Sequence, residues 1–257
     1  TETHLNAVVA GTKEKIRRKA MNEQRVAVIT GGSGNLGSVV TRRFLRAGYV
    51  VMVPWHAPGK WEDLCQSVDD SVEDRLDGME ADLTSEEDAR RLMEQVKERH
   101  GRPYALLNLV GGFAFGEKVW EMDLSTWRKM LDLNLTTAFL CCKHAVPRMR
   151  EAGRGHIVNV TSKACLDLQP GASAYAVSKT GVITLTRCMR EELKETSISV
   201  NAIMPSIIDT PVTRRIMPDG DPGKWVEPAD IAEVLLSVCD GQCDALSGSV
   251  LRLFGKL

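Results

Sequence analysis

A tyrosine and a lysine stand four residues apart, Tyr175 and Lys179, within a stretch of helical periodicity. Residues at this spacing share one face of a helix, so their side chains lie close together. A tyrosine hydroxyl titrates near pH ~10, and a neighbouring ammonium group favours the phenolate and lowers that pKa toward the range useful for proton transfer. Ser162 comes thirteen residues before Tyr175 and could hydrogen-bond a carbonyl oxygen. The combination, rather than the tyrosine–lysine pair alone, predicts chemistry at a carbonyl or alcohol oxygen.

A glycine-rich octapeptide, TGGSGNLG, runs from Thr30 to Gly37 directly after an apolar run. Gly32, Gly34 and Gly37 have the GxGxxG spacing, which permits a tight turn, close approach of the backbone to a pyrophosphate, and close packing of helix on strand. The helix that follows would direct its free N–H groups and positive dipole end at the phosphates. The motif predicts a dinucleotide site, and the alternative is a glycine-rich turn without a ligand.

Six short apolar runs are predicted to form the buried strands that position the glycine-rich turn and the residues Ser162, Tyr175 and Lys179. They are Arg25–Thr30, Tyr49–Val53, Tyr104–Val110, His156–Thr161, Ile198–Ile203 and Ser249–Phe254. Continuous apolar runs suit a parallel sheet covered on both faces. Helical patterns lie between them, such as Ser85–Gly101, which opens on a capping serine, and Tyr175–Lys194, which has one apolar face. The alternation predicts a three-layer, doubly wound α/β fold, with ligands at the carboxyl ends of the strands.

Composition limits the function classes. The chain has 257 residues, of which 43% are hydrophobic and 26% charged, which excludes a disordered or collagen-like chain. No apolar run reaches the ~18 residues of a membrane span. The 33 basic and 34 acidic residues give no global attraction to nucleic acid or anionic lipid. We therefore expect a globular protein with a small-molecule substrate and neither nucleic acid nor membrane as a partner.

The seven cysteines are odd in number and scattered, which argues against a disulfide framework. The chain has no CxxC pair and no neighbouring set of histidine ligands, so we expect no metal site. Cys239 and Cys243 are four residues apart, but no further metal ligands lie near them in the sequence. Free thiols indicate a reducing compartment. A signal peptide would have an apolar core after its basic start, and none follows the basic segment Lys13–Lys19. We expect a cytoplasmic protein, with residues 1–24 as a flexible extension and residues 25–257 as a single domain.

In the order and spacing of its motifs the chain resembles the short-chain dehydrogenase/reductase family over about Arg25 to Gly255. The motifs are TGGSGNLG, Asp82–Leu83, NLVGG at Asn108–Gly112, Asn134 within LDLNLTTAF, Ser162, YAVSK at Tyr175–Lys179, and NAIMPSIIDT at Asn201–Thr210. The resemblance implies a Rossmann fold with a parallel sheet of about seven strands, and an NAD(P)-dependent enzyme that interconverts a carbonyl and an alcohol.

The resemblance also assigns catalytic roles. Tyr175 would be the general acid/base, Lys179 would bind the nicotinamide ribose and tune Tyr175, and Ser162 would polarise the carbonyl. Asn134 would hold a water molecule in the proton relay; alternatively, its polar side chain satisfies a local break in an apolar helix.

The implied cofactor site draws on every motif, with Asp82 at the adenine and Thr210 at the carboxamide. Besides Tyr175 and Lys179, its residues are Gly31, Ser33, Gly34, Asn35, Leu36, Gly37, Trp55, His56, Asp82, Leu83, Asn108, Val110, Gly111, Pro205, Ile208 and Thr210. Three departures from the family pattern affect the geometry of this site. Asn35 replaces a glycine, although asparagine tolerates a left-handed backbone. NLVG stands for the usual NNAG, and Pro205–Ser206 for proline–glycine.

Cofactor choice depends on the end of the second strand, where an acidic residue would bind the ribose 2′-hydroxyl of NAD and repel the 2′-phosphate of NADP. Trp55 and His56 follow the run Tyr49–Val53, and no acid follows until Glu62. Trp55 could stack on adenine, and His56, with Lys60 within reach, could face the phosphate. We therefore expect NAD(P)H with a preference for NADP(H); in the alternative, Trp55 and His56 only pack the turn.

Residues 211–227 are expected to form a lid over the substrate, because PDGDPGKW at Pro218–Trp225 is rich in turn formers. Arg214 and Arg215 could meet an anionic substrate or be solvated charges, and Trp225 could close over the substrate or pin the loop. The stretch Leu131–Val146 is apolar nearly all round, which predicts burial by a second copy and a homotetramer.

Three further interpretations remain open at this level. The whole chain looks most similar to 3-oxoacyl-carrier-protein reductases, whereas VGGFAFG at Val110–Gly116 is similar to pteridine-type reductases. A non-catalytic dinucleotide sensor is the alternative from another class, although it would not need Ser162, Tyr175, Lys179 and Asn134 together.

Overall fold

Seven strands form one parallel sheet in the computed structural model, which describes residues 24–241 and 245–257. The strands are β1 (Val26–Thr30), β2 (Val50–Trp55), β3 (Leu76–Glu80), β4 (Pro103–Asn108), β5 (Gly155–Val160), β6 (Ile198–Pro205) and β7 (Val250–Leu253). Their order across the sheet is β3-β2-β1-β4-β5-β6-β7, and every pairing is parallel. This confirms the doubly wound fold. The expectations for residues 1–23 and for Cys243 lie outside the described residues.

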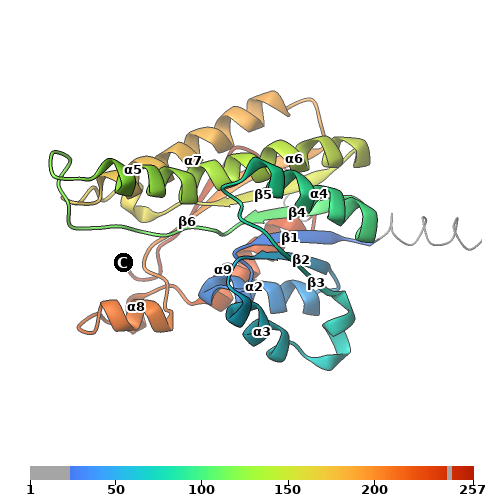
Figure 1. Ribbon diagram of the computed structural model, residues 1–257, viewed down its shortest axis with the longest axis horizontal. Coiled ribbons are helices and arrows are strands. Elements are labelled where there is room, and N and C mark those ends of the chain that lie inside the picture. The colour runs from blue at the N-terminus through green and yellow to red at the C-terminus, as the bar shows by residue number, and fades with distance from the viewer. Residues whose placement is uncertain (1–23, 242–244) are drawn as a thin grey trace, which may run out of the picture.

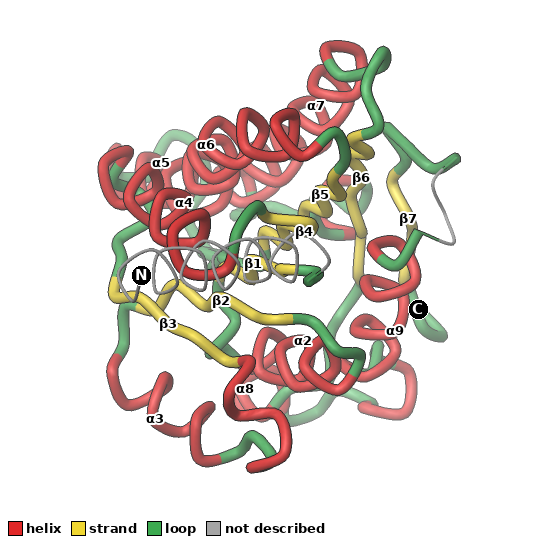
Figure 2. The backbone as a smooth tube through the Cα atoms, turned by 90° about the vertical axis from the view of Figure 1, so that its right-hand side faces the viewer, coloured by secondary structure: helices red, strands yellow, loops and turns green. Residues whose placement is uncertain are grey.

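Helices cover both faces of the sheet, as Figures 1 and 2 show. The helices are α2 (Asn35–Arg46), α3 (Pro58–Gln66), α4 (Glu86–His100), α5 (Leu124–Leu131), α6 (Thr137–Ala152), α7 (Ser173–Glu192), α8 (Pro211–Ile216) and α9 (Pro228–Cys239). One layer contains α4, α5, α6 and α7, and the other contains α2, α3 and α9 (Figure 2). Each face of the sheet has its own buried apolar cluster. Within the described ranges, no helix is long and apolar enough to cross a membrane.

The strand order reverses between β1 and β4, and in folds of this kind the crevice beyond the carboxyl ends of those strands binds the ligand. Thr30 ends β1 and links the two strands there: its Oγ1 accepts hydrogen bonds from the N–H groups of Leu109, at 3.1 Å, and Val110, at 3.3 Å. One buried hydroxyl thereby holds the glycine turn beside the segment that follows β4.

Two elements differ from the sequence expectations. The strand β3 was absent from the apolar runs because it is the sheet edge, and only Met79 of its sequence LDGME is buried. The expected single helix Leu131–Val146 is wrong in its bounds: α5 runs into a π-helical turn at Asp132–Thr136, and α6 continues from it. Asn134 lies in that turn, where a wider backbone ring re-aims the side chains.

Candidate active site

The turn after β1 packs so tightly that side chains are excluded from it. Gly31 has φ of 67°, and a Cβ on Gly37 would lie 1.9 Å from the Gly31 carbonyl oxygen. Gly34 is the N-cap of α2 and supplies no side-chain cap, and the first turn of α2 has no acidic residue. The Gly34 N–H donates to the Gly31 carbonyl at 2.9 Å and closes the turn, so the N–H groups of the first turn of α2, such as that of Leu36, are the ones that can face an anion. An anion at this positive end of a helix fits a pyrophosphate.

Asn35 does not adopt the left-handed backbone conformation that its residue type tolerates. It is the first residue of α2, and every described residue other than glycine has negative φ. The left-handed conformation falls on Gly31 instead, so the tolerance of asparagine for that conformation is not used.

Ser162, Tyr175 and Lys179 lie together at the carboxyl end of β5. Ser162 lies two residues after the end of β5 and hydrogen-bonds Tyr175, and its Oγ also accepts the N–H of Ala164 at 3.2 Å. Lys179, one turn after Tyr175 on α7, is 4% exposed and donates from Nζ to the Val160 carbonyl at 2.9 Å. Thr161 Oγ1 donates to the Lys179 carbonyl at 2.8 Å and joins the helix to the strand.

The pKa values of the pair differ from the sequence expectation. Burial raises the pKa of Tyr175, and the hydrogen bond with Ser162 offsets this only in part. Burial also lowers the pKa of Lys179 to about 8. The expected lowering of the Tyr175 pKa by the Lys179 ammonium is therefore wrong for this structure, because desolvation of both groups is the largest effect.

Asn134 and Lys179 converge on the segment after β4. A Cβ on Gly111 would lie 2.9 Å from both Lys179 Nζ and Asn134 Oδ1. Asn134 Oδ1 accepts the N–H of Gly112 at 2.9 Å, and its Nδ2 donates to the Gly112 carbonyl at 3.0 Å and to Ser178 Oγ at 3.1 Å. Both polar ends of the amide thus hold the backbone of Gly112, which lies after β4 and not in the helix that carries Asn134.

Two other expected cofactor residues are in the core. Asn108 is buried, and its Nδ2 donates to Asn159 Oδ1 on β5 at 2.8 Å. Leu83 is buried in the apolar cluster on the α4 and α6 side. The side chains of both residues are thus held in the core, whereas Val110 and Gly111 follow the end of β4 directly or nearly so.

At the far end of the crevice, Trp55 is the last residue of β2 and not part of the turn beyond it. Its ring stacks on Trp61, with centroids 6.2 Å apart and planes 11° apart. His56 is exposed and borders a hollow of about 360 Å³, whose other lining residues are Glu80, Ala81, Asp82, Asp88 and Arg91.

Asp82 lines this hollow with its carboxylate already engaged. Its Oδ1 accepts from Thr84 Oγ1 at 2.7 Å, and this hydrogen bond is the main cause of a lowered pKa, to which His56 adds a smaller effect. Glu80, Asp88 and Arg91 were not among the expected residues, because only the packing of α4 beside β3 brings them here.

The expected lid, residues 211–227, is reached a few residues after β6, whose last residue, Pro205, is buried. Ile208 pairs with Val226 in an isolated parallel bridge, and Thr210 caps α8 by accepting the N–H of Thr213 at 3.1 Å. Arg214 donates two hydrogen bonds of 2.6 Å to Asp209, so it is not free for a substrate anion. Trp225 is buried, and a Cβ on Gly220 would lie 2.4 Å from its ring, so Trp225 pins the loop.

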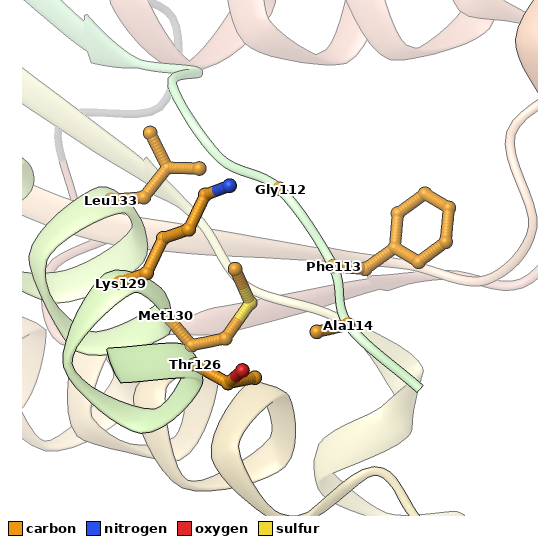
Figure 3. Close-up of a pocket in the computed structure, with 7 residues that line it drawn as sticks. All are labelled: Gly112, Phe113, Ala114, Thr126, Lys129, Met130 and Leu133. Atoms are coloured by element: carbon orange, nitrogen blue, oxygen red, sulfur yellow. The ribbon is translucent and has the colours of Figure 1, made fainter. Parts of the chain in front are cut away.

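Two phenylalanines beside Tyr175 were not among the residues expected from the sequence. The ring of Phe115 lies 6.0 Å from that of Tyr175, and Phe113 lies 6.0 Å from Phe115. A hollow of about 340 Å³ lies between Gly112–Ala114 and α5; Lys129 and Met130 of α5 and Leu133 of the following π-helical turn line its other side (Figure 3). The run FAF was the available signal, but only the fold shows that it lies beside Tyr175.

Comparison with known proteins agrees with this geometry. Residues 25–221 match the family model described as short chain dehydrogenase. Cis-4-hydroxycyclohexanecarboxylate dehydrogenase of Sinomonas cyclohexanicum is 29% identical over 90% of this chain and 96% of its own length. The 3-oxoacyl-[acyl-carrier-protein] reductase FabG of Thermotoga maritima is 26% identical over 91% of this chain and 98% of its own.

The fold has a counterpart among solved structures. ElxO with NADP bound superposes with a TM-score of 0.83 at 24% identity, covering 90% of this chain and 98% of that one. The family model spans most of the chain, and the protein therefore belongs to the short-chain dehydrogenase family of oxidoreductases.

Proposed function

We propose that the protein is an NAD(P)-dependent carbonyl reductase or secondary-alcohol dehydrogenase, with Ser162, Tyr175, Lys179 and Asn134 as its catalytic set. The observation that carries the proposal is the convergence of these groups. Tyr175 hydrogen-bonds Ser162, and a Cβ on Gly111 would lie 2.9 Å from both Lys179 Nζ and Asn134 Oδ1. A bound nicotinamide would supply or accept the hydride at the substrate carbon.

The chain supplies the proton and the positioning. The hydroxyls of Ser162 and Tyr175 donate hydrogen bonds to the carbonyl oxygen and stabilise the negative charge that develops there. Tyr175, which burial keeps protonated, gives its proton to that oxygen in reduction and takes it back in alcohol oxidation. Lys179 places a positive charge next to Gly111, where the sugar next to the nicotinamide would bind, and Asn134 holds the Gly112 backbone in register.

The preferred cofactor in this proposal is NADP(H). Trp55 and His56 stand at the end of β2, where a carboxylate would repel a 2′-phosphate, and His56 and Arg91 line the adjoining hollow. Glu80, Asp82 and Asp88 line it as well and act against a phosphate, and Arg91 forms an ion pair of 3.3 Å with Asp88. In this proposal the preference therefore depends on His56.

The names of the relatives support a reaction class rather than a substrate. One relative is a dehydrogenase of a cyclic hydroxy acid and another reduces a 3-oxoacyl group on a carrier protein. The step common to both is conversion between a ketone and a secondary alcohol, which is the reaction we propose here. A 3-oxoacyl-carrier-protein substrate, whose ketone lies on a linear chain, is the alternative that a panel of ring-bearing and linear ketones distinguishes.

The proposal extends to the whole chain: a single catalytic domain over residues 25–257 with the lid at residues 211–227, located in the cytoplasm and assembled as a homotetramer. The experiment that tests the function is a panel of ketones and secondary alcohols, followed by nicotinamide absorbance with both cofactors. Turnover of at least one substrate that stops when Ser162 is replaced by alanine supports it; binding of the dinucleotide without turnover of any substrate would favour the sensor.

A further inference from the structure

Two phenylalanines form an apolar surface that starts at the catalytic tyrosine. The rings of Phe115 and Tyr175 are 6.0 Å apart and tilted by 45°, and those of Phe113 and Phe115 are 6.0 Å apart and nearly edge-to-face at 62°. Phe113 is 52% exposed and Phe115 50%. Figure 3 shows the Phe113 ring directed away from Lys129, Met130 and Leu133, so it does not fill the hollow beside α5. We call Phe113 and Phe115 the aromatic wall.

The segment that carries the aromatic wall is held at both ends. On one side, Asn134 hydrogen-bonds both the N–H and the carbonyl of Gly112. On the other, the Gly116 N–H donates to the Gly171 carbonyl at 3.2 Å, and a Cβ on Gly171 would lie 2.8 Å from the Gly116 nitrogen. The wall is therefore fixed in place before a ligand arrives, which reduces the entropy cost of binding.

Two of the charged side chains in the neighbouring segments are already paired. Lys163, next to Ser162 in the chain, forms an ion pair of 3.0 Å with Asp167, and Arg214 of the lid is bound to Asp209. Leu166 and Leu168, on the segment that leads to Gly171, are exposed as well. An exposed apolar surface beside a reacting group is typical of a ligand pocket.

We infer that the aromatic wall binds a flat ring of the substrate next to its reacting carbonyl, so that the substrate class is ring-bearing ketones and secondary alcohols. The inference rests on the proposed function, because the hydrogen bond between Tyr175 and Ser162 sets where the carbonyl lies. A ring beside that carbonyl reaches Phe115, whose 6.0 Å spacing to Tyr175 is within the range of favourable aromatic pairs. A linear alkyl chain gains only the free energy of burying its apolar surface, without the aromatic pairing.

The test compares acetophenone with 2-octanone, two methyl ketones of equal carbon number. We expect the wild-type enzyme to have the higher kcat/KM for acetophenone, and Phe115→Leu to lower the ratio of the two values by roughly 3- to 10-fold. Trp120→Leu is the matched control, because Trp120 lies on the same segment, is 79% exposed and has its ring against Lys118; this variant should leave the ratio unchanged. A ratio that is unchanged in Phe115→Leu, or a wild-type preference for 2-octanone, overturns the inference.

A binding measurement separates this inference from the proposed function. Each ketone is titrated into the protein with NADP⁺, a mixture that cannot react because both components are oxidised. Tighter binding of acetophenone that is lost in Phe115→Leu supports the aromatic wall even if no turnover is found, in which case the proposed function alone fails. Equal binding of the two ketones by the wild-type protein contradicts the inference whatever the turnover.

Discussion

At the scale of single residues, desolvation sets the chemistry of the site more than the tyrosine–lysine pairing does. Burial raises the pKa of Tyr175 and lowers the pKa of Lys179 to about 8, so it keeps Tyr175 protonated and brings the loss of the Lys179 proton close to neutral pH. A protonated tyrosine is the form that donates to a carbonyl oxygen. The residues themselves were predictable from YAVSK and Ser162, but the direction of the pKa shifts was not, because it depends on packing between α7, β5 and the segment after β4.

The pH profile of carbonyl reduction follows from these shifts. Reduction uses the acid forms of both groups, the Tyr175 hydroxyl and the Lys179 ammonium. The raised pKa of Tyr175 keeps its proton in place, whereas Lys179 loses its own as the pH passes about 8. We expect kcat/KM for reduction to be level near neutral pH and to fall above about pH 8, approaching roughly tenfold per pH unit. A rate that rises with pH across this range would contradict the assignment.

His56 is the residue on which the cofactor preference should depend. A protonated imidazole attracts a 2′-phosphate, and histidines are more often protonated at pH 6 than at pH 8. The dissociation constant for NADPH should therefore lie further below that for NADH at pH 6, and His56→Ala should remove the difference. His100→Ala is the control, since His100 contacts Asp77 outside the hollow. Equal constants for the two cofactors at both pH values would remove the basis for the preference.

At the scale of elements, the sequence motifs predicted the strand ends well and the helix interruption poorly. The GxGxxG spacing placed Gly37 where α2 meets the turn, because only glycine permits that approach. The π-helical turn at Asp132–Thr136 has no comparable sequence motif. The apolar pattern of Leu131–Val146 continues through it, and the polar residue Asn134 is the one feature that indicates it. The strand β3 was missed for the opposite reason, since an edge strand has little apolar sequence to detect.

Gly37→Ala tests the turn as an element. The added methyl group would lie 1.9 Å from the Gly31 carbonyl oxygen, so the turn and the start of α2 must move apart. We expect a loss of about 1–3 kcal/mol in the free energy of unfolding and at least tenfold weaker dinucleotide binding. Gly59→Ala is the matched control, because a Cβ there meets nothing within 4 Å. Calorimetric titration checks both; equal affinities in the two variants would show that the turn tolerates the displacement.

At the scale of the whole molecule, the doubly wound sheet was predictable in full outline, whereas the assembly is not visible in a single chain. The helices α5, α6 and α7 lie side by side on one face (Figure 1). They expose Leu124, Phe139 and Val177, three large apolar side chains. The stretch Leu131–Val146, which we expect a second copy to bury, is thus not fully covered within one chain. This is the surface on which the proposed tetramer depends.

Light scattering tests the assembly directly. The wild-type protein should have the mass of a tetramer at micromolar concentration, and Phe139→Glu should yield a smaller species, because a charge would be buried at the contact. Val212→Glu, at an exposed apolar position on α8, is the control and should leave the mass unchanged. A wild-type protein that is monomeric at this concentration would refute the proposal.

The central claim is that Tyr175 transfers the proton, and Tyr175→Phe tests it most directly. The variant keeps the ring beside Phe115 and removes only the hydroxyl that bonds Ser162. The measurement is kcat for carbonyl reduction together with the dissociation constant for NADPH, on wild type and variant at the same pH. The account predicts a fall in kcat of at least ~10²–10⁴ with cofactor affinity nearly unchanged. A variant that keeps most of the wild-type kcat would contradict it.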